Sequence, residues 1–439
     1  MLSRLGSMTT IRERSFNMLV ILEHFKTIAA IPHCSREADE LYTFLVSFAK
    51  GKGYVVETDS AKNIHIFKGD PTLCLQAHYD MVCMGKAPEI DIYEEEGWLK
   101  AKDSSLGADN GIAIAMMMQL MEEGETLEFL LTSDEEIGLI GANALEFTLR
   151  SSSMLNLDSE EEAEVYIGCA GGADIVAFKP YALIEDNRPA YRVTVRGLPG
   201  GHSGVDIDKD IPNALKLLAA YLQDKSVGLV SLKGGERRNS IPAEAEAIVR
   251  SDTPLEGNTL YHVEPIESDA AVLYGGEEII MLLHGFRHGV QAMNQEFEIP
   301  ERSINLAIVE TKDGVCHIET SARAMSAAGL EYICYETESF FGSYGYDVRI
   351  EDKYPSWKPE VNSFTKRVNS CVEEVFGESR MMAIHAGLEC GVIGEKYPGM
   401  KLASIGPTIR YPHSTREEVK IDSVEKTFSV VKRVIAALD

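Results

Sequence analysis

Two adjacent carboxylates, Glu135 and Glu136, follow the apolar run at residues 127–131. Neighbouring side chains of a strand point to opposite faces. Both could therefore serve one site only if the chain turns at residues 133–137, where the strand ends. Strand ends in an open α/β sheet commonly carry a binding site. Most paired glutamates are surface charge, so the pair by itself fits a solvated acidic turn better than a site.

Further ionisable residues stand where a predicted strand ends or a predicted helix begins. Together with the glutamate pair, the candidates are His78, Asp80, Asp109, Glu135, Glu136 and Asp158, with His413 in the loop after the last predicted strand. Each has an ordinary alternative: a core histidine for His78, a helix N-cap for Asp109 and a loop residue for His413. Their joint placement at one edge of the sheet favours a metal site.

The residue types indicate which metals would bind. Imidazole and carboxylate ligands without thiolate suit Zn²⁺, Mn²⁺ or Co²⁺, and two ions about 3.5 to 4 Å apart need a carboxylate that bridges them. Such a pair also needs a base. Of two consecutive glutamates at a turn, one could bind a metal while its neighbour takes a proton from the attacking water.

The elements that must position these residues alternate along the first part of the chain. Strand patterns are at residues 55–56, 63–67, 72–77, 127–131 and 154–157, and helical patterns are at 16–30, 36–50, 112–123 and 137–150. This order predicts an α/β fold with a mostly parallel sheet sandwiched by helices. We expect Ser35 to cap the helix at 36–50, and the residues through about Arg14 to form a polar leader.

A change of pattern near residues 186–189 predicts a domain boundary. We expect a catalytic domain made of residues 1–187 and 352–439, with an inserted α+β lid domain at 188–351. The remaining strands are predicted at residues 191–196, 244–250, 304–310, 314–320 and 401–405, and the remaining helices at 209–224, 324–340, 361–376 and 423–438. Residues 257–300 give no clear pattern.

Composition excludes several classes of partner. The chain has 439 residues and a formal charge of −27, which repels nucleic acid and anionic membranes. Apolar runs are too short for a membrane span or a signal peptide. The eight cysteines form no Cys-x-x-Cys pair, which predicts reduced thiols and a cytoplasmic location. The acidic run at residues 160–162 is interpreted as a solvated face.

Several motifs resemble one known family. They are the segments at residues 75–82, 105–111, 135–136, 156–162 and 168–172, continued by those at 200–204, 238–242, 385–391 and 404–408. In this order they closely resemble the PepD-type aminoacyl-histidine dipeptidases, also called cytosol nonspecific dipeptidases. These enzymes belong to the di-zinc carboxypeptidase G and aminoacylase family. The resemblance covers most of the chain from about residue 20.

The resemblance implies a role for each ligand candidate. His78 and Asp158 would hold one zinc ion, Glu136 and His413 would hold the other, and Asp109 would bridge the two. Asp80 would orient a ligand through a hydrogen bond. Glu135 would act as general base and then protonate the leaving amine. The family also implies a cis peptide bond between Asp109 and Asn110.

The resemblance also implies residues that contact the substrate. His202 would reach across a closed cleft and stabilise the oxyanion at the scissile carbonyl. Asn239 and Arg323 match positions that bind substrate carboxylate and backbone, and the planar fork of arginine suits a carboxylate. Gly387 and Glu389 are further substrate-binding candidates. Glu389 would capture the α-ammonium group, or else it would be a buried, helix-capping residue.

The function implied is hydrolysis of unblocked dipeptides, with aminoacyl-histidine substrates first. The inserted domain looks shorter than in typical relatives, with the loss between about residues 252 and 300, which bears on substrate preference and on a homodimer formed through the lid. One alternative is an N-acyl amino acid amidohydrolase or a carboxypeptidase with the same chemistry. Another is a catalytically silent metal-binding or assembly protein on the same scaffold.

Overall fold

The computed structural model describes residues 2–438, with side chains from Phe16 onward. The chain forms two compact units. The first unit comprises Met1–Gly168, Trp357–Ala383 and Leu388–Asp439, and the second comprises Cys169–Ser356 and Ile384–Gly387. The predicted lid domain at residues 188–351 lies inside the second unit. That unit reaches further in both directions because two strands flanking the predicted domain pair within its sheet.

An eight-stranded mixed sheet, with strand order β1-β2-β6-β3-β7-β23-β8-β22, forms the centre of the first unit. Its strands are β1 (Val55–Thr58), β2 (Ile64–Phe67), β3 (Leu73–His78), β6 (Glu128–Thr132), β7 (Ser153–Asn156), β8 (Glu164–Cys169), β22 (Arg380–Ile384) and β23 (Lys401–Ser404). The neighbours β6, β3, β7 and β23 run parallel, while β1, β2 and β8 are antiparallel to theirs. Every residue of β3 and β6 is buried, so both faces of the sheet are covered, as predicted.

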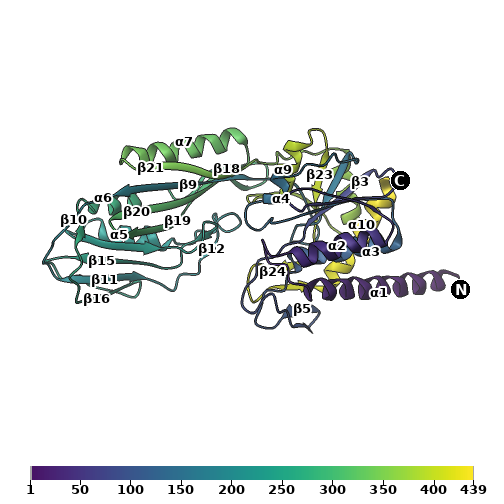
Figure 1. Cartoon of the computed structure of the whole chain (residues 1–439), viewed down its shortest axis with the longest axis horizontal. Coiled ribbons are helices and arrows are strands. Elements are labelled where there is room, and N and C mark those ends of the chain that lie inside the picture. The colour runs from purple at the N-terminus through teal and green to yellow at the C-terminus, as the bar shows by residue number, and fades with distance from the viewer. Residues whose placement is uncertain (1, 439) are drawn as a thin grey trace. The chain divides into compact units, whose positions relative to one another are not determined.

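The helices of the first unit pack against this sheet or against one another (Figure 1). They are α1 (Leu2–Ala29), α2 (Asp39–Gly51), α3 (Ala108–Glu123), α4 (Ile140–Asn143), α8 (Ser363–Phe376), α9 (Glu389–Lys396) and α10 (Ile421–Leu438). The residues through about Arg14, expected to form a polar leader ahead of the helix predicted at 16–30, are part of that helix, because α1 begins at Leu2. The stretch before the predicted start contains no proline, and so nothing in it interrupts the backbone hydrogen bonds of a helix. Among the described residues, we find no helix long and apolar enough to cross a membrane.

The helix predicted at residues 137–150 is confined to the single turn of α4. Gly138 and Leu139 have positive φ angles of 111° and 56°, so a helix cannot begin before them. Further along, the backbone N–H groups of Arg150 and Ser151 donate to the carboxylate of Glu128, at 2.8 Å each. These bonds to a buried strand residue hold the segment away from a helical path.

A small antiparallel sheet completes the first unit and carries the loop of His413. Its strand order is β24-β25-β5-β4, formed by β24 (Ile409–Arg410), β25 (Glu418–Lys420), β5 (Trp98–Ala101) and β4 (Ile92–Glu95). His413 lies in the connection between β24 and β25, as predicted for a loop after β23.

The second unit is a nine-stranded sheet with helices on one face (Figure 1). Its strands are β9 (Gly171–Pro180), β11 (Ala190–Val195), β13 (Gly228–Gly234), β15 (Ala245–Arg250), β16 (Tyr261–Ile266), β18 (Gly289–Asn294), β19 (Ile299–Lys312), β20 (Val315–Ala324) and β21 (Asp347–Tyr354). The helices are α5 (Ala214–Leu222), α6 (Glu277–Gly285) and α7 (Ala327–Ser343). Their buried side chains share one apolar core with alternate residues of the strands, for example Ile175, Val193 and Ile318.

Two short strand pairs complete the second unit. They are β10 (Leu183–Ile184) with β17 (Val272–Leu273), and β12 (Gly201–His202) with β14 (Ser240–Ile241). The region at residues 257–300, which gave no clear pattern, forms β16, β17, α6 and β18. Strand β16 shows why the sequence was uninformative: its side chains are exposed or half-buried, so it has no regular apolar alternation.

The prediction that all cysteines are reduced was wrong for one pair. Cys34 and Cys83 form a disulfide, with their Cα atoms 5.5 Å apart. The two residues are 49 positions apart, so their spacing in the sequence does not predict the disulfide. A parallel bridge between Cys34 and Met81 brings the two segments together. The six other cysteines form no disulfide and are buried.

The start of α8 offers a test of local stability. Asn362 accepts hydrogen bonds from the backbone N–H groups of Phe364 (2.9 Å) and Thr365 (3.1 Å), and the side chain of Thr365 completes a capping box. Asn362→Ala should therefore lower the free energy of unfolding by about 1 kcal/mol, measured by urea denaturation. Ser370→Ala, an exposed change on the same helix, should stay within about 0.5 kcal/mol of wild type. Equal effects of the two changes would contradict the capping role.

Candidate active site

His78 ends β3 and lies at the centre of the predicted ligand set. Its side chain is 1% exposed, and its Nδ1 atom is 2.9 Å from the backbone oxygen of Asp80. A carbonyl only accepts, so Nδ1–H donates this bond, and in the neutral ring Nε2 carries a lone pair. That Nε2 atom faces Asp109 Oδ1 at 3.2 Å and Asp158 Oδ1 at 3.3 Å. Two carboxylates would repel a lone pair, so this arrangement calls for a cation between them.

The pKa of His78 also indicates that its surroundings favour a positive charge. Burial lowers this pKa, but the carboxylates of Asp158, Asp109 and Asp80 outweigh burial and raise it well above the ordinary value. These carboxylates therefore stabilise either a proton or a metal ion on this histidine.

His413 forms a second, similar group. Its Nε2 atom is 2.9 Å from Glu136 Oε2 and 3.2 Å from Asp109 Oδ2. Burial lowers the pKa of His413, but the bonds to Asp109 and Glu136 raise it to about 12. The other oxygen of Glu136, Oε1, is buried and has no hydrogen-bond partner in the structure. An unpaired buried carboxylate oxygen is costly, and a metal ion would supply the missing partner.

Asp109 connects the two groups. Its Oδ1 atom faces His78 and its Oδ2 atom faces His413, which is the arrangement predicted for a bridging ligand. Burial raises the pKa of Asp109, but the two histidines outweigh this effect and lower it. The peptide bond between Asp109 and Asn110 is cis, which confirms that prediction.

The spacing of the donor atoms fits metal ions. Three sets of ligand atoms lie within 4.8 Å of one another: His78 with Asp109 and Asp158, Asp109 with Glu136 and His413, and His78 with Glu135 and Glu136. Bonds of about 2.0 to 2.1 Å around tetrahedral zinc put neighbouring donor atoms about 3.3 Å apart. The separations of 3.2 and 3.3 Å around His78 match this value.

The strand β6 ends at Thr132, and the chain turns directly after it. Asp134 has a positive φ of 49°, and the backbone oxygen of Glu135 accepts from Gly138 (3.0 Å) and Leu139 (2.8 Å). The turn predicted at residues 133–137 is therefore present. It places the carboxylates of Glu135 and Glu136 beside the same histidine, His78.

Burial raises the pKa of Glu135 well above its ordinary value. The nearby His78 opposes this effect, while the charges of Glu136, Asp158 and Glu389 add to it. A carboxyl group with a raised pKa is a good proton acceptor once a nearby cation favours its ionised form. This environment suits the predicted role of general base.

Asp80 supports both the first histidine and this turn. Its Oδ1 atom accepts from the backbone N–H of Glu135 at 3.0 Å and lies 3.5 Å from His78 Nδ1. The shorter contact of His78 is with the backbone oxygen of Asp80, so both the main chain and the side chain of Asp80 orient that ring. Burial raises the pKa of Asp80, but the bonds to His78, Ser35 and Glu135 outweigh burial and lower it.

The prediction that Ser35 caps α2 was wrong. The N-cap residue is Ala38, and Ser35 Oγ instead donates to Asp80 Oδ2 at 2.7 Å. The neighbouring Arg36 N–H donates to Asp134 Oδ1 at 2.6 Å, and Cys34 is tied by its disulfide. The segment at residues 34–36 therefore stabilises the turn at residues 133–137. Local spacing could not reveal it, because a serine before a helix ordinarily signals a cap.

Glu160 is a residue whose placement the sequence misjudged. It was interpreted as part of a solvated face, but burial together with the charge of Asp109 raises its pKa to about 8. The charges of Asp158 and Glu136 act in the same direction. Glu160 therefore belongs to the electrostatic surroundings of the ligand cluster. Its position two residues after Asp158 was the available signal.

Glu389, the first residue of α9, is fully buried. Its Oε2 atom accepts from Gln76 Nε2 (2.5 Å) and Thr132 Oγ1 (2.6 Å), while Oε1 has no hydrogen-bond partner in the structure. Burial raises the pKa of Glu389 to about 7. The N-cap position belongs to Leu388 and has no side-chain cap bond. The alternative of a helix-capping glutamate is therefore wrong, although the residue is buried.

His202, in the second unit, has the tautomer that the predicted role requires. Its Nδ1 atom accepts from the backbone N–H groups of Gly204 (3.2 Å) and Val205 (3.3 Å). In the neutral ring the proton is then on Nε2, which is a donor. Asp206 fixes the backbone by accepting from the N–H of His202 at 2.7 Å.

The second unit contains three other predicted substrate-binding residues, Asn239, Arg323 and Gly387. Asn239 is exposed, and its backbone oxygen accepts from Ser203 at 2.8 Å. Arg323 is buried in β20 and donates through Nη1 to Tyr354 Oη at 2.8 Å, while its buried Nε has no partner in the structure. A Cβ on Gly387 would lie 2.8 Å from the ring of Tyr354. Gly387 therefore makes room for the tyrosine that orients Arg323.

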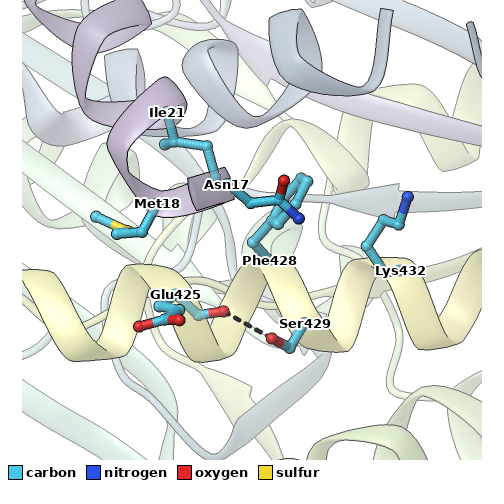
Figure 2. A pocket seen from close by; sticks show the side chains of 7 residues that line it. All are labelled: Asn17, Met18, Ile21, Glu425, Phe428, Ser429 and Lys432. Atoms are coloured by element: carbon cyan, nitrogen blue, oxygen red, sulfur yellow. Dashed lines mark hydrogen bonds between the residues drawn. The ribbon is translucent and has the colours of Figure 1, made fainter. Parts of the chain in front are cut away.

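A pocket between α1 and α10 lies away from these residues. Figure 2 shows Asn17 of α1 beside Phe428 of α10, and Ser429 donates to the backbone oxygen of Glu425 at 2.9 Å. None of the predicted ligands lines this pocket. We therefore place the candidate active site at the histidine and carboxylate groups.

The fold and the site define an α/β metal-dependent hydrolase with a second unit inserted in its chain. Residues 74–437 match the peptidase family M20/M25/M40, and the chain belongs to this family. The sequence is 32% identical to the cytosol non-specific dipeptidase of Escherichia coli (strain K12), over 94% of this chain and 96% of that protein.

Solved structures show the same relationship. The aminoacylhistidine dipeptidase of Vibrio alginolyticus matches with a TM-score of 0.76 and 31% identity, over 95% of this chain and 96% of that one. Human carnosine dipeptidase 1 matches with a TM-score of 0.58 and 12% identity, over 97% of both chains, and thus shares the fold.

The two histidine groups predict a stepwise loss of metal. His413→Ala removes one ligand from the group with Glu136 but leaves the group of His78 intact. The variant should therefore retain about one divalent ion per chain where the wild type retains about two, measured by elemental analysis after dialysis against Zn²⁺. His262→Ala, at an exposed histidine of β16, is the control and should bind as the wild type does. Full retention of metal by His413→Ala would contradict the assignment.

Proposed function

We propose that this protein is a di-metal dipeptidase that hydrolyses unblocked dipeptides, with aminoacyl-histidine substrates preferred. The observation that carries the proposal is Asp109, whose two carboxylate oxygens face two different histidines, each with a further carboxylate beside it. The names of the similar proteins from E. coli and V. alginolyticus support the substrate class.

The ligand roles follow the two groups in the structure. His78 and Asp158 would hold one ion, Glu136 and His413 the other, and Asp109 both. When bound, two divalent ions would supply Lewis-acid activation of water and of the substrate carbonyl. Zn²⁺ is our assignment, although Mn²⁺ and Co²⁺ accept the same nitrogen and oxygen donors.

Glu135 is proposed as the general base. It would take a proton from the attacking water and deliver it to the nitrogen of the leaving amine, so that no net proton is gained or lost by the enzyme. Asp80 holds the backbone of Glu135 and the ring of His78, and it would keep the base beside the ligands during turnover.

The remaining assignments concern the scissile carbonyl and the two ends of the dipeptide. His202 would donate its Nε2 proton to the oxygen of the scissile carbonyl, where negative charge develops. Arg323, held by Tyr354, would bind the substrate carboxylate with the assistance of Asn239. The unpaired Oε1 of Glu389 would accept from the α-ammonium group, and Gly387 preserves the space for Tyr354.

Location and assembly are also proposals. We propose a cytoplasmic protein, on the strength of its similarity to the E. coli enzyme, since the Cys34–Cys83 disulfide removes the support that reduced cysteines would have given. We also propose a homodimer formed through the second unit, where α7 exposes Tyr332 and Tyr335. Sedimentation velocity tests the dimer, and a monomer at all concentrations would refute it.

Glu135→Gln should separate metal binding from catalysis. The amide cannot accept the proton, so the variant should retain both metal ions and lose at least about 100-fold in kcat. Initial-rate measurements on an unblocked dipeptide, with metal content determined on the same sample, provide the test. Glu94→Gln, an exposed glutamate of β4, is the control. Activity of Glu135→Gln equal to wild type would show that another residue is the base.

A pair of substrates separates the proposed reaction from its alternatives. If Glu389 binds the α-ammonium group, an Xaa-His dipeptide should be hydrolysed at least about tenfold faster, in kcat/KM, than its N-acetyl form, because the acetyl group removes the charge. Preference for the acetylated compound would favour an amidohydrolase. Preference for longer peptides would favour a carboxypeptidase. A metal-loaded protein inactive on a broad dipeptide panel would favour a silent metal-binding protein.

A further inference from the structure

Glu417 lies four residues after His413, in the connection between β24 and β25, and is only 3% exposed. Its two carboxylate oxygens accept hydrogen bonds from four consecutive backbone N–H groups. Oε2 accepts from Leu106 (2.7 Å) and Gly107 (3.0 Å), and Oε1 accepts from Ala108 (2.8 Å) and Asp109 (3.2 Å). One of these four donors is the backbone of the bridging ligand.

No residue of the loop itself replaces the Glu417 carboxylate as the acceptor for these N–H groups. The N-cap residue of α3 is Gly107, which provides no side-chain cap bond, and the first N–H groups of a helix have no partners within the helix. Gly107 has a φ of 70°, and a Cβ there would lie 2.9 Å from the sulfur of Met81. The shape of the loop therefore depends on glycine and on an acceptor that is 309 residues away from Ala108.

The same hairpin also carries a predicted metal ligand. Ile409 pairs with Val419 in its two strands, and the backbone N–H of Glu417 donates to Ser414 at 3.2 Å. His413 and Asp109 are thus tied to one another through Glu417. Because each oxygen of Asp109 faces a different histidine, a shift of the Asp109 backbone would disturb both ligand groups together.

We propose that Glu417 is a positioning residue that holds the bridging carboxylate of Asp109 in register with His413, and so sets the geometry of the metal pair. Its effect on turnover rests on the proposed dipeptidase function, whereas its effect on the metal pair does not. The alternative is that Glu417 only caps α3, which would affect stability but leave the metal pair unchanged.

Glu417→Gln is the decisive substitution. Glutamine has the same size but only one acceptor oxygen, so its amide nitrogen would face two backbone N–H donors. Glu417→Asp keeps two acceptor oxygens on a shorter side chain and tests for partial rescue. Glu418→Gln is the matched control, because the adjacent carboxylate pairs with Lys100 (3.1 Å) and Arg410 (3.9 Å) rather than with the loop.

The experiment uses the full chain, depleted of metal and reconstituted with Mn²⁺. Two Mn²⁺ ions sharing a carboxylate give an exchange-coupled electron paramagnetic resonance signal. Glu417→Gln should lose that coupled signal and bind Mn²⁺ about 10- to 100-fold more weakly, as is typical when support of a ligand is removed. Dipeptide hydrolysis should fall by a comparable factor, mainly in kcat. Glu417→Asp should lie between this variant and wild type, and Glu418→Gln should match wild type.

The outcomes separate positioning from capping. If folded Glu417→Gln, judged by circular dichroism, keeps wild-type Mn²⁺ affinity and a wild-type signal, the positioning role is refuted even if thermal stability is lower. If Glu417→Gln does not fold, the same measurements on Glu417→Asp decide the matter. If the wild type gives no coupled signal, equal Mn²⁺ affinities of wild type and variant refute the proposal. Wild-type protein without dipeptidase activity would refute the proposed function alone.

Discussion

Attraction between buried carboxylates and a positive charge is the interaction on which the rest of this structure depends. Asp109, Glu136 and Asp158 converge on the imidazoles of His78 and His413. Burial raises the pKa values of Glu136 and Asp158, because charged carboxylates are poorly stabilised away from water. Cations would remove this cost, and they would also give the unpaired Oε1 of Glu136 a partner. Metal binding and stability of the site are therefore linked.

The fold restricts the positions of these charged side chains. The parallel strands β3, β6 and β7 end side by side, so the residues that follow them meet at one sheet edge. Hydrogen bonds that involve backbone groups then fix the geometry: His78 donates to the backbone oxygen of Asp80, the N–H of Glu135 donates to the Asp80 carboxylate, and the loop of Asp109 donates to the Glu417 carboxylate. Each of these contacts joins a backbone group to a buried side chain, an arrangement that orients the ligand candidates.

The two units supply different chemistry. The first provides acids, imidazoles and a candidate base, whereas the second provides donors: the Nε2–H of His202 and the guanidinium of Arg323. In peptide hydrolysis, nucleophile activation needs acceptors and the developing oxyanion needs donors. Membership of the peptidase family M20/M25/M40 agrees with hydrolysis of peptide bonds, and Oε1 of Glu389 is a buried carboxylate oxygen without a hydrogen-bond partner in the structure.

The sequence by itself indicated the candidate ligands, the strands that carry them and the turn at Glu135, because strand ends and glycine-framed loops are local patterns. The cis peptide bond after Asp109 followed from family resemblance. Only the tertiary structure decided the contacts of Ser35, the charged surroundings of Glu160, the disulfide of Cys34 and the hydrogen bonds of Glu417. These depend on partners tens to hundreds of residues away, as with the 309 residues between Glu417 and Ala108. Side-chain periodicity records which face of an element is buried, but not which distant atom will meet it.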